Sequence, residues 1–192
     1  MQAFLLSFGI IFVAELGDKS QLMALAFAAR YRPLPILVGI TAATALVHAL
    51  SVVVGAMLGL ALPTRTISVI AGIAFLGFAV WTIRGDRLDY AEAAKAGRPV
   101  RSAAAAAAAA VAVAFFVAEL GDKTMLATIT LATTEGPLAT WVGSTLGMVV
   151  ADALGIVVGA QLGSHLPERT IKIGAAASFV VFGVLLVVEG LR

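Results

Sequence analysis

The sequence predicts an all-α integral membrane protein of six transmembrane helices, arranged as two inverted three-helix repeats. Three observations lead to this fold class. The chain is 61% hydrophobic and only 12% charged, whereas soluble domains average about 25% charged residues. Apolar runs of the length needed to span a bilayer, about 20 residues, recur between short polar connections. An eight-residue motif also occurs twice, as Phe12–Lys19 and Phe116–Lys123.

The apolar runs divide a single transmembrane domain, 1–192, into two repeats joined by a polar linker. Repeat 1 covers 1–84, the linker 85–102 and repeat 2 103–192. Pro and Arg residues end most runs, and the alanine-rich start of repeat 2 favours a helix. The expected spans lie at about 4–28, 35–62, 66–83, 103–133, 138–166 and 170–188.

The distribution of Lys and Arg predicts the orientation. One side of the membrane would hold Arg30, Arg32, Arg84, Arg87, Lys95, Arg98, Arg101, Arg169 and Lys172. The other side would hold only Arg65 and Arg192. The positive side is expected to be cytoplasmic. We therefore expect a multi-pass protein of the cell inner (plasma) membrane, with a cytoplasmic linker, both termini outside and no cleaved signal peptide.

The two halves match without a gap at an offset of 104 residues. Beyond the motif, Val38-Gly39 matches Val142-Gly143, and Pro63 matches Pro167. An odd number of spans in each unit makes the second unit enter the membrane from the opposite face. Such inverted repeats recur in secondary transporters, with the substrate site at mid-bilayer between the halves. A duplication that only closed a stable bundle is the alternative.

The repeated motif places carboxylates inside apolar runs, where each charged group costs roughly 2.5–3.5 kcal/mol on insertion scales. Glu15 and Asp18 would share a helix face, as would Glu119 and Asp122. If the repeats meet, four carboxylates converge at one depth and suit a hard divalent cation. Further expected ligands are Ser20, Gln21 and Thr124, with Met125 as a soft ligand that would favour Mn²⁺ over Ca²⁺, or as simple packing.

Other motif residues have two interpretations each. Lys19 and Lys123 lie one turn after a Glu, so they either pair with a carboxylate during transport or only compensate charge for insertion. Gly17 and Gly121 permit a close helix contact or a local break, and we expect close contact.

A second polar pair, His48 and Asp152, occupies equivalent positions near mid-span. We expect Asp152 to lie on the cation or proton path, because a lone acid inside a membrane is rarely structural. His48 would relay a proton or hydrogen-bond between helices.

Together these residues predict cation handling and no enzymatic activity. Crowded carboxylates in a low-dielectric interior also bind protons, which would compete with the metal and couple the two movements. The absence of Cys removes thiolate chemistry. Expected partners are a divalent metal ion, protons and the lipid bilayer, without nucleic acid or a bound cofactor; self-association into a homo-oligomer is compatible with the sequence.

Two Glu-x-Gly-Asp-Lys-(Ser/Thr) signatures, each in the first helix of a three-span repeat, resemble those of the Gdt1-like family of cation/proton exchangers. The resemblance covers the whole chain. It implies that Glu15, Asp18, Glu119 and Asp122 form the cation path. It also implies Mn²⁺ export from the cytoplasm against inward protons, with Ca²⁺ as the competing substrate.

Two other classes also fit acids in a membrane. An intramembrane aspartyl protease needs two aspartates that share a proton, whereas each repeat here carries Glu, Asp and Lys. A cation channel usually assembles its pore from several subunits, whereas this chain has its own internal symmetry. Transport by alternating access is the preferred interpretation.

Overall fold

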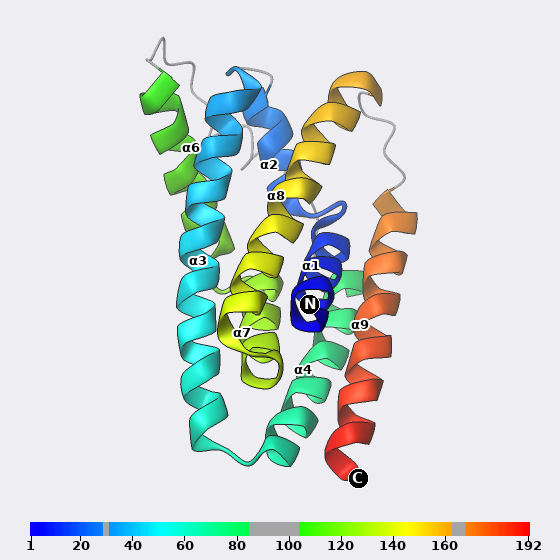
Figure 1. Ribbon diagram of the computed structural model, residues 1–192. Coiled ribbons are helices and arrows are strands. Elements are labelled where there is room, and N and C mark those ends of the chain that lie inside the picture. Colours follow the sequence, from blue (N-terminus) through cyan, green and yellow to red (C-terminus); the bar gives the residue numbers. More distant parts are fainter. Residues whose placement is uncertain (29–30, 85–103, 163–167) are drawn as a thin grey trace.

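The structure is a computed structural model that describes residues 1–28, 31–84, 104–162 and 168–192. Within these ranges some helical side chains, including that of Lys19, lie outside the description. The described residues form helices and no strand (Figure 1). The helices are α1 (Gln2–Glu15), α2 (Lys19–Ala28), α3 (Pro33–Ala61), α4 (Thr64–Arg84), α6 (Ala104–Glu119), α7 (Lys123–Glu135), α8 (Pro137–Leu162) and α9 (Glu168–Leu191).

Several helices have the length and composition of membrane spans. Three described segments qualify alone, Pro33–Ala61, Arg65–Arg84 and Pro137–Val157, and the bent pair α6–α7 makes a fourth if it counts as one span. Gln2–Glu15 and Phe179–Leu191 are shorter apolar helices. The all-α membrane class is therefore confirmed for the described residues. The expected linker, 85–102, lies outside the described residues, and α6 begins just after it at Ala104.

The helices of the two repeats pack against each other in a symmetric way. At the offset of 104 residues, α1 corresponds to α6, α3 to α8 and α4 to α9. α1 lies along α8, α6 lies along α3, and α4 packs against α9. α3 and α8 run in opposite directions (Figure 1). Equivalent glycines permit the close approaches: a Cβ on Gly39 would lie 2.5 Å from the Ala108 carbonyl oxygen, and one on Gly143 would lie 2.6 Å from that of Phe4. Small residues let helices approach in this way in membranes.

The first helix of each repeat is broken within the motif, which corrects two expectations. We expected continuous helices over 4–28 and 103–133, but α1 ends at Glu15 and α6 at Glu119, and α6 and α7 meet at a bend of 72°. Gly17 and Gly121 have φ of +74° and +78°, a conformation that glycine adopts without steric cost. No atom of the described residues lies within 4 Å of a Cβ placed on Gly121, so the expected close packing is wrong there.

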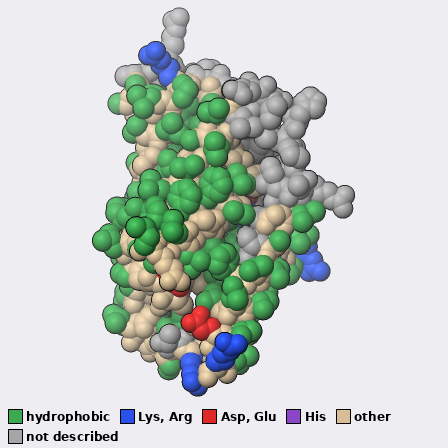
Figure 2. Space-filling view, turned by 45° about the vertical axis from the view of Figure 1, so that its right-hand side comes forward, with side chains coloured by type: hydrophobic (Ala, Val, Ile, Leu, Met, Phe, Trp, Pro, Cys, Tyr) green, Lys and Arg blue, Asp and Glu red, His purple; other side chains and the backbone are tan. Residues whose placement is uncertain are grey.

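Two apolar clusters of described residues fill the interior. One joins α1, α4, α7, α8 and α9 around Phe75 and Phe179, and the other joins α2, α3, α6 and α8 around Phe27 and Phe115. Apolar side chains are spread over the described part of the face in Figure 2, whereas Lys and Arg lie near its ends and edge and an acid lies near the lower end. An apolar exterior around polar groups in the interior fits helices that face lipid.

Candidate cation site

The acids of both motifs lie at the two helix breaks. Glu15 is the last residue of α1 and Asp18 precedes α2; Glu119 is the last residue of α6 and Asp122 precedes α7. All four are buried, with exposed fractions of 0%, 2%, 1% and 5% in that order. Because a break frees backbone groups from the helix, irregular backbone at membrane depth is typical of polar sites.

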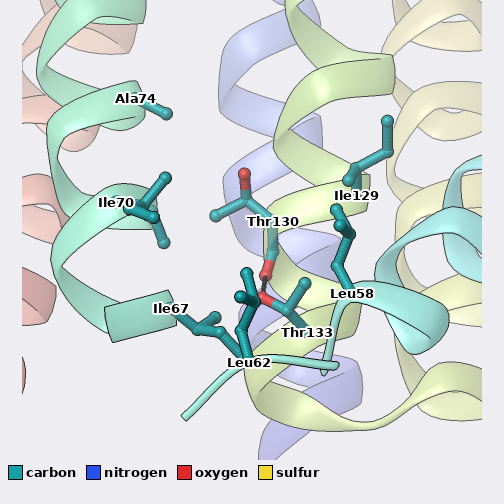
Figure 3. A pocket seen from close by; sticks show the side chains of 9 residues that line it. Leu58, Leu62, Ile67, Ile70, Ala74, Ile129, Thr130 and Thr133 are labelled. Carbon is teal, nitrogen blue, oxygen red and sulfur yellow. Dashed lines mark hydrogen bonds between the residues drawn. The ribbon is translucent and has the colours of Figure 1, made fainter. Parts of the chain in front are cut away.

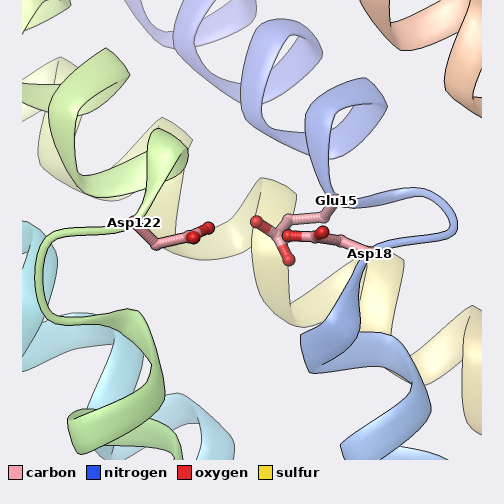
Figure 4. A group of neighbouring side chains, drawn as sticks. All are labelled: Glu15, Asp18 and Asp122. Atoms are coloured by element: carbon pink, nitrogen blue, oxygen red, sulfur yellow. The ribbon is translucent and has the colours of Figure 1, made fainter. Parts of the chain in front are cut away.

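Three of these carboxylates form one group. Oxygens of Glu15, Asp18 and Asp122 all lie within 4.8 Å of one another, so both repeats contribute (Figure 4). Figure 4 shows the three side chains pointing toward each other from the two breaks. Carboxylate oxygens at this spacing can converge on one hard divalent cation.

The three carboxylates come together across the helix breaks and not along one helix face, as the spacing of Glu15 and Asp18 in the sequence had suggested. Glu15 and Asp18 do not share a helix face, because the chain leaves the helix between them. Glu119 is not part of the three-residue group; its Oε2 accepts a hydrogen bond of 3.1 Å from Thr124. The equivalent Ser20 hydroxyl donates to Glu15. Both motif hydroxyls therefore orient the acid of their own repeat.

A lysine from one repeat pairs with an acid of the other. Lys123 Nζ lies 2.9 Å from Asp18 Oδ1, and both side chains are almost fully buried. Helical spacing suggested a partner in the same repeat, whereas this ion pair joins the two breaks. The side chain of Lys19 lies outside the described residues.

The two remaining expected ligands contact the break glycines. Gln21 Oε1 accepts the Gly17 N–H at 2.9 Å, and Met125 sulfur accepts the Gly121 N–H at 3.2 Å. The Gln21 amide also donates to the Ala151 carbonyl on α8 at 2.8 Å. Gln21 and Met125 are equivalent in the repeat, so each stabilises the break in its own half.

His48 and Asp152 are both buried, and no hydrogen bond joins their side chains in the described part of the chain. His48 Nδ1 lies 3.4 Å from the Thr145 hydroxyl, which joins α3 to α8. Neither carboxylate oxygen of Asp152 has a hydrogen-bond partner in the described part of the chain. Thr44 and Met148 are repeat equivalents, and they meet at the same α3–α8 interface. The Thr44 hydroxyl donates to the Met148 sulfur at 3.5 Å.

The site carries more buried acceptors than donors. Within the described residues, Glu15 Oε1, Asp18 Oδ2, Glu119 Oε1 and both Asp152 oxygens are buried without a hydrogen-bond partner. Buried acceptors that lack a donor are costly. A cation or protons would satisfy them, and this is the chemistry that the arrangement offers.

Sequence reasoning missed three buried hydroxyls on the helices that follow the second motif. Thr128 on α7 and Thr140 and Ser144 on α8 are fully buried. Thr128 lies one turn after Thr124, and Thr140 and Ser144 lie one turn apart. The spacing of four residues between these hydroxyls is visible in the sequence and could have indicated that they share a helix face.

Apolar helices around a buried group of carboxylates define an integral membrane protein that handles cations. A family described as "Divalent cation/proton antiporter GDT1" matches residues 3–90 and 107–192. The chain belongs to this GDT1 family, which is a family of transporters.

Individual relatives agree. The chain is 32% identical over 184 residues to a "Putative manganese exporter" of Vibrio cholerae, which covers 94% of this chain and 88% of that protein. It is 29% identical to a GDT1-like protein of Synechocystis over 96% of both chains. It is 30% identical to the chloroplastic GDT1-like protein 2 of Oryza sativa, of which it spans 59%. No solved structure gives a significant match.

Proposed function

We propose that this divalent cation/proton antiporter exports Mn²⁺ from the cytoplasm in exchange for protons, with Ca²⁺ as a competing substrate. The observation that carries the proposal is the group Glu15, Asp18 and Asp122, which draws ligands from both repeats within 4.8 Å. Manganese is favoured by the printed name of the Vibrio cholerae relative. Ser20, Thr124 and Glu119 complete or support this site.

The proposed architecture has six spans in two inverted repeats, 1–84 and 103–192, with α1–α2 and α6–α7 as broken first spans. Opposite directions of α3 and α8 and reciprocal packing of α1 on α8 and α6 on α3 support the inversion. The protein lies in the inner membrane with linker 85–102 in the cytoplasm and both termini outside, as the Lys and Arg distribution favours.

The cation and protons use the same acids in turn. With the cation bound, Glu15, Asp18 and Asp122 are ionised and coordinate it. Without the cation, protons on carboxylates and the ammonium of Lys123 on Asp18 compensate the charge. Because either form leaves the buried site nearly neutral, both can cross between the inward and outward states, which couples the two fluxes.

Asp152 and His48 act beside this site. Asp152 lies on the same helix as Ala151, whose carbonyl binds Gln21 next to the first break. Its two carboxylate oxygens, which have no hydrogen-bond partner within the described ranges, suit Asp152 to carry a proton in the exchange. His48 holds α3 to α8 through Thr145.

The test is metal-dependent proton flux in proteoliposomes, with Mn²⁺ and Ca²⁺ compared at equal concentration. We expect saturable Mn²⁺ movement coupled to opposite proton movement. Glu15→Gln should abolish it, whereas Glu189→Gln, an exposed acid near the C-terminus, should leave it unchanged. Saturable flux in Glu15→Gln equal to that of the wild type would refute the site, and proton-independent, unsaturable current would indicate a channel.

A further inference from the structure

Three buried hydroxyls on α7 and α8 behave unlike most others in the chain. The oxygens of Thr128, Thr140 and Ser144 have no hydrogen-bond partner in the described part of the chain, although all three residues are 0% exposed. A Ser or Thr inside an apolar helix commonly donates to the carbonyl one turn earlier. Ser51 and Thr130 do so, at 2.8 and 3.0 Å. A buried hydroxyl without a partner is costly, which suits these three for contact with a passing polar species.

These hydroxyls extend away from the carboxylates. Thr128 follows by one turn Thr124, whose hydroxyl binds Glu119. α8 packs against both α7 and α1, and carries Thr140 and Ser144 on the segment that runs antiparallel to α7. On α1, Ser7 is also 0% exposed, but its hydroxyl donates to the Ala3 carbonyl at 2.7 Å, so it is satisfied by its own helix. A Cβ on Gly143 would lie 3.0 Å from the Ser7 Cβ, which places this part of α1 beside Ser144 on α8.

The equivalent positions of the other repeat are all apolar. Ser7, Thr128, Thr140 and Ser144 correspond, at the 104-residue offset, to Val111, Ala24, Ile36 and Ile40. These four apolar residues are fully buried and belong to one packed cluster. Since equivalent helices pack in equivalent ways, positions that converge in one repeat converge in the other. The hydroxyls therefore share one region between α1, α7 and α8.

We propose that Thr128, Thr140 and Ser144 line a hydrated path between the carboxylates and the α7–α8 turn. Their repeat equivalents Ala24, Ile36 and Ile40 form an apolar gate on the opposite side, together with Val111. This asymmetry rests on the proposed function, since the path serves the exchanged cation and protons. The α7–α8 turn lies in the lower half of Figure 1, away from the start of α3. On the proposed orientation, the path leads outward and the gate closes the cytoplasmic side.

Hydroxyls on another face of α7 do not contribute to this path. Thr130 and Thr133 border a cavity of about 90 Å³ that is otherwise lined by aliphatic residues of α3, α4 and α7 (Figure 3). The Thr133 hydroxyl donates to the Thr130 carbonyl at 2.6 Å, and that of Thr130 donates to Leu126. Because their own helix satisfies them, they offer nothing to a cation. This face therefore supplies control positions.

Cysteine accessibility tests the asymmetry directly, because the chain contains no Cys. Single variants Thr128→Cys and Ser144→Cys are compared with their repeat equivalents Ala24→Cys and Ile40→Cys. A small charged thiol reagent is added to membrane vesicles without metal. We expect labelling at least about tenfold faster in the hydroxyl set, because the reagent needs water and a thiolate to react. Equal rates within each pair, whether both fast or both undetectable, would overturn the proposal.

Transport by isosteric variants gives a second readout. Thr128→Val and Thr140→Val keep the side-chain shape, and each should slow Mn²⁺ export about tenfold by removing a buried polar contact. Equilibrium Mn²⁺ binding should stay within about twofold, since the carboxylates remain. Ser51→Ala, a buried hydroxyl bonded to its own helix, is the control. Wild-type rates in both Val variants would overturn the path.

The two proposals fail in different ways. If the wild-type protein neither bound nor moved Mn²⁺, the proposed substrate would be wrong, yet the metal-free labelling rates would still decide the hydroxyl path. If Mn²⁺ exchange were present but labelling were symmetric, only the path would be wrong.

Discussion

The ion pair between Lys123 and Asp18 offers the sharpest test of how the repeats meet. The charges are 2.9 Å apart and almost fully buried, so their Coulomb attraction is about 6 kcal/mol at an effective dielectric constant of about 20. Desolvation offsets much of this attraction. Removal of one charge still leaves the other buried, and Lys123→Met should lower the free energy of unfolding by about 3–5 kcal/mol.

The assay is a double-mutant cycle on unfolding in mixed detergent micelles. Lys123→Met, Asp18→Asn and the double variant are compared, with Arg84→Met as an exposed control. The double variant should recover stability relative to the sum of the single effects, by roughly 1–3 kcal/mol. Strictly additive effects would refute the cross-repeat pair.

Three further predictions concern the breaks and the interface. Gly121→Ala should destabilise the protein by about 1–2 kcal/mol, because its φ is positive, whereas Gly77→Ala, inside α4 with free space, should be neutral or stabilising in the same unfolding assay. Asp152→Asn should retain Mn²⁺ binding, measured by calorimetry, but lose proton counterflow in liposomes; unchanged counterflow would exclude it as a proton carrier. Gly39→Ala should separate α3 from α6 and cost more stability than Gly77→Ala, because its Cβ would meet the Ala108 carbonyl at 2.5 Å; equal costs would contradict that contact.

Much of the site could be read from the sequence because its signals are local. Hydropathy marks the apolar helices, and the offset of 104 residues marks the duplication. Charge in an apolar run is expensive, so Glu15, Asp18 and Asp122 could be singled out without coordinates. The family assignment relied on the same residues, and the comparisons confirmed it.

The geometry of the two helix breaks could not be predicted, because the local sequence allows two conformations there. Gly17 and Gly121 allow either a tight contact or a left-handed turn, and the spacing of Glu15 and Asp18 is the same in both cases. The structure has the turn, which moves Asp18 off the face of α1. Gln21 and Met125 were likewise predicted as cation ligands from their side-chain types. In the structure they accept hydrogen bonds from the backbone N–H groups of the two turn glycines.

The sequence by itself determined an apolar helical protein with a duplicated acidic motif, since composition and repetition require no knowledge of packing. Only the tertiary structure decided that Asp18 meets Lys123 and Asp122 of the other repeat, because such pairs depend on distances between helices remote in the chain. It also decided that Thr128 and Ser144 are buried with no hydrogen-bond partner among the described residues, while Ala24 and Ile40 pack in an apolar core. Burial and hydrogen-bond partners are properties of the folded arrangement, and they make two similar halves chemically different.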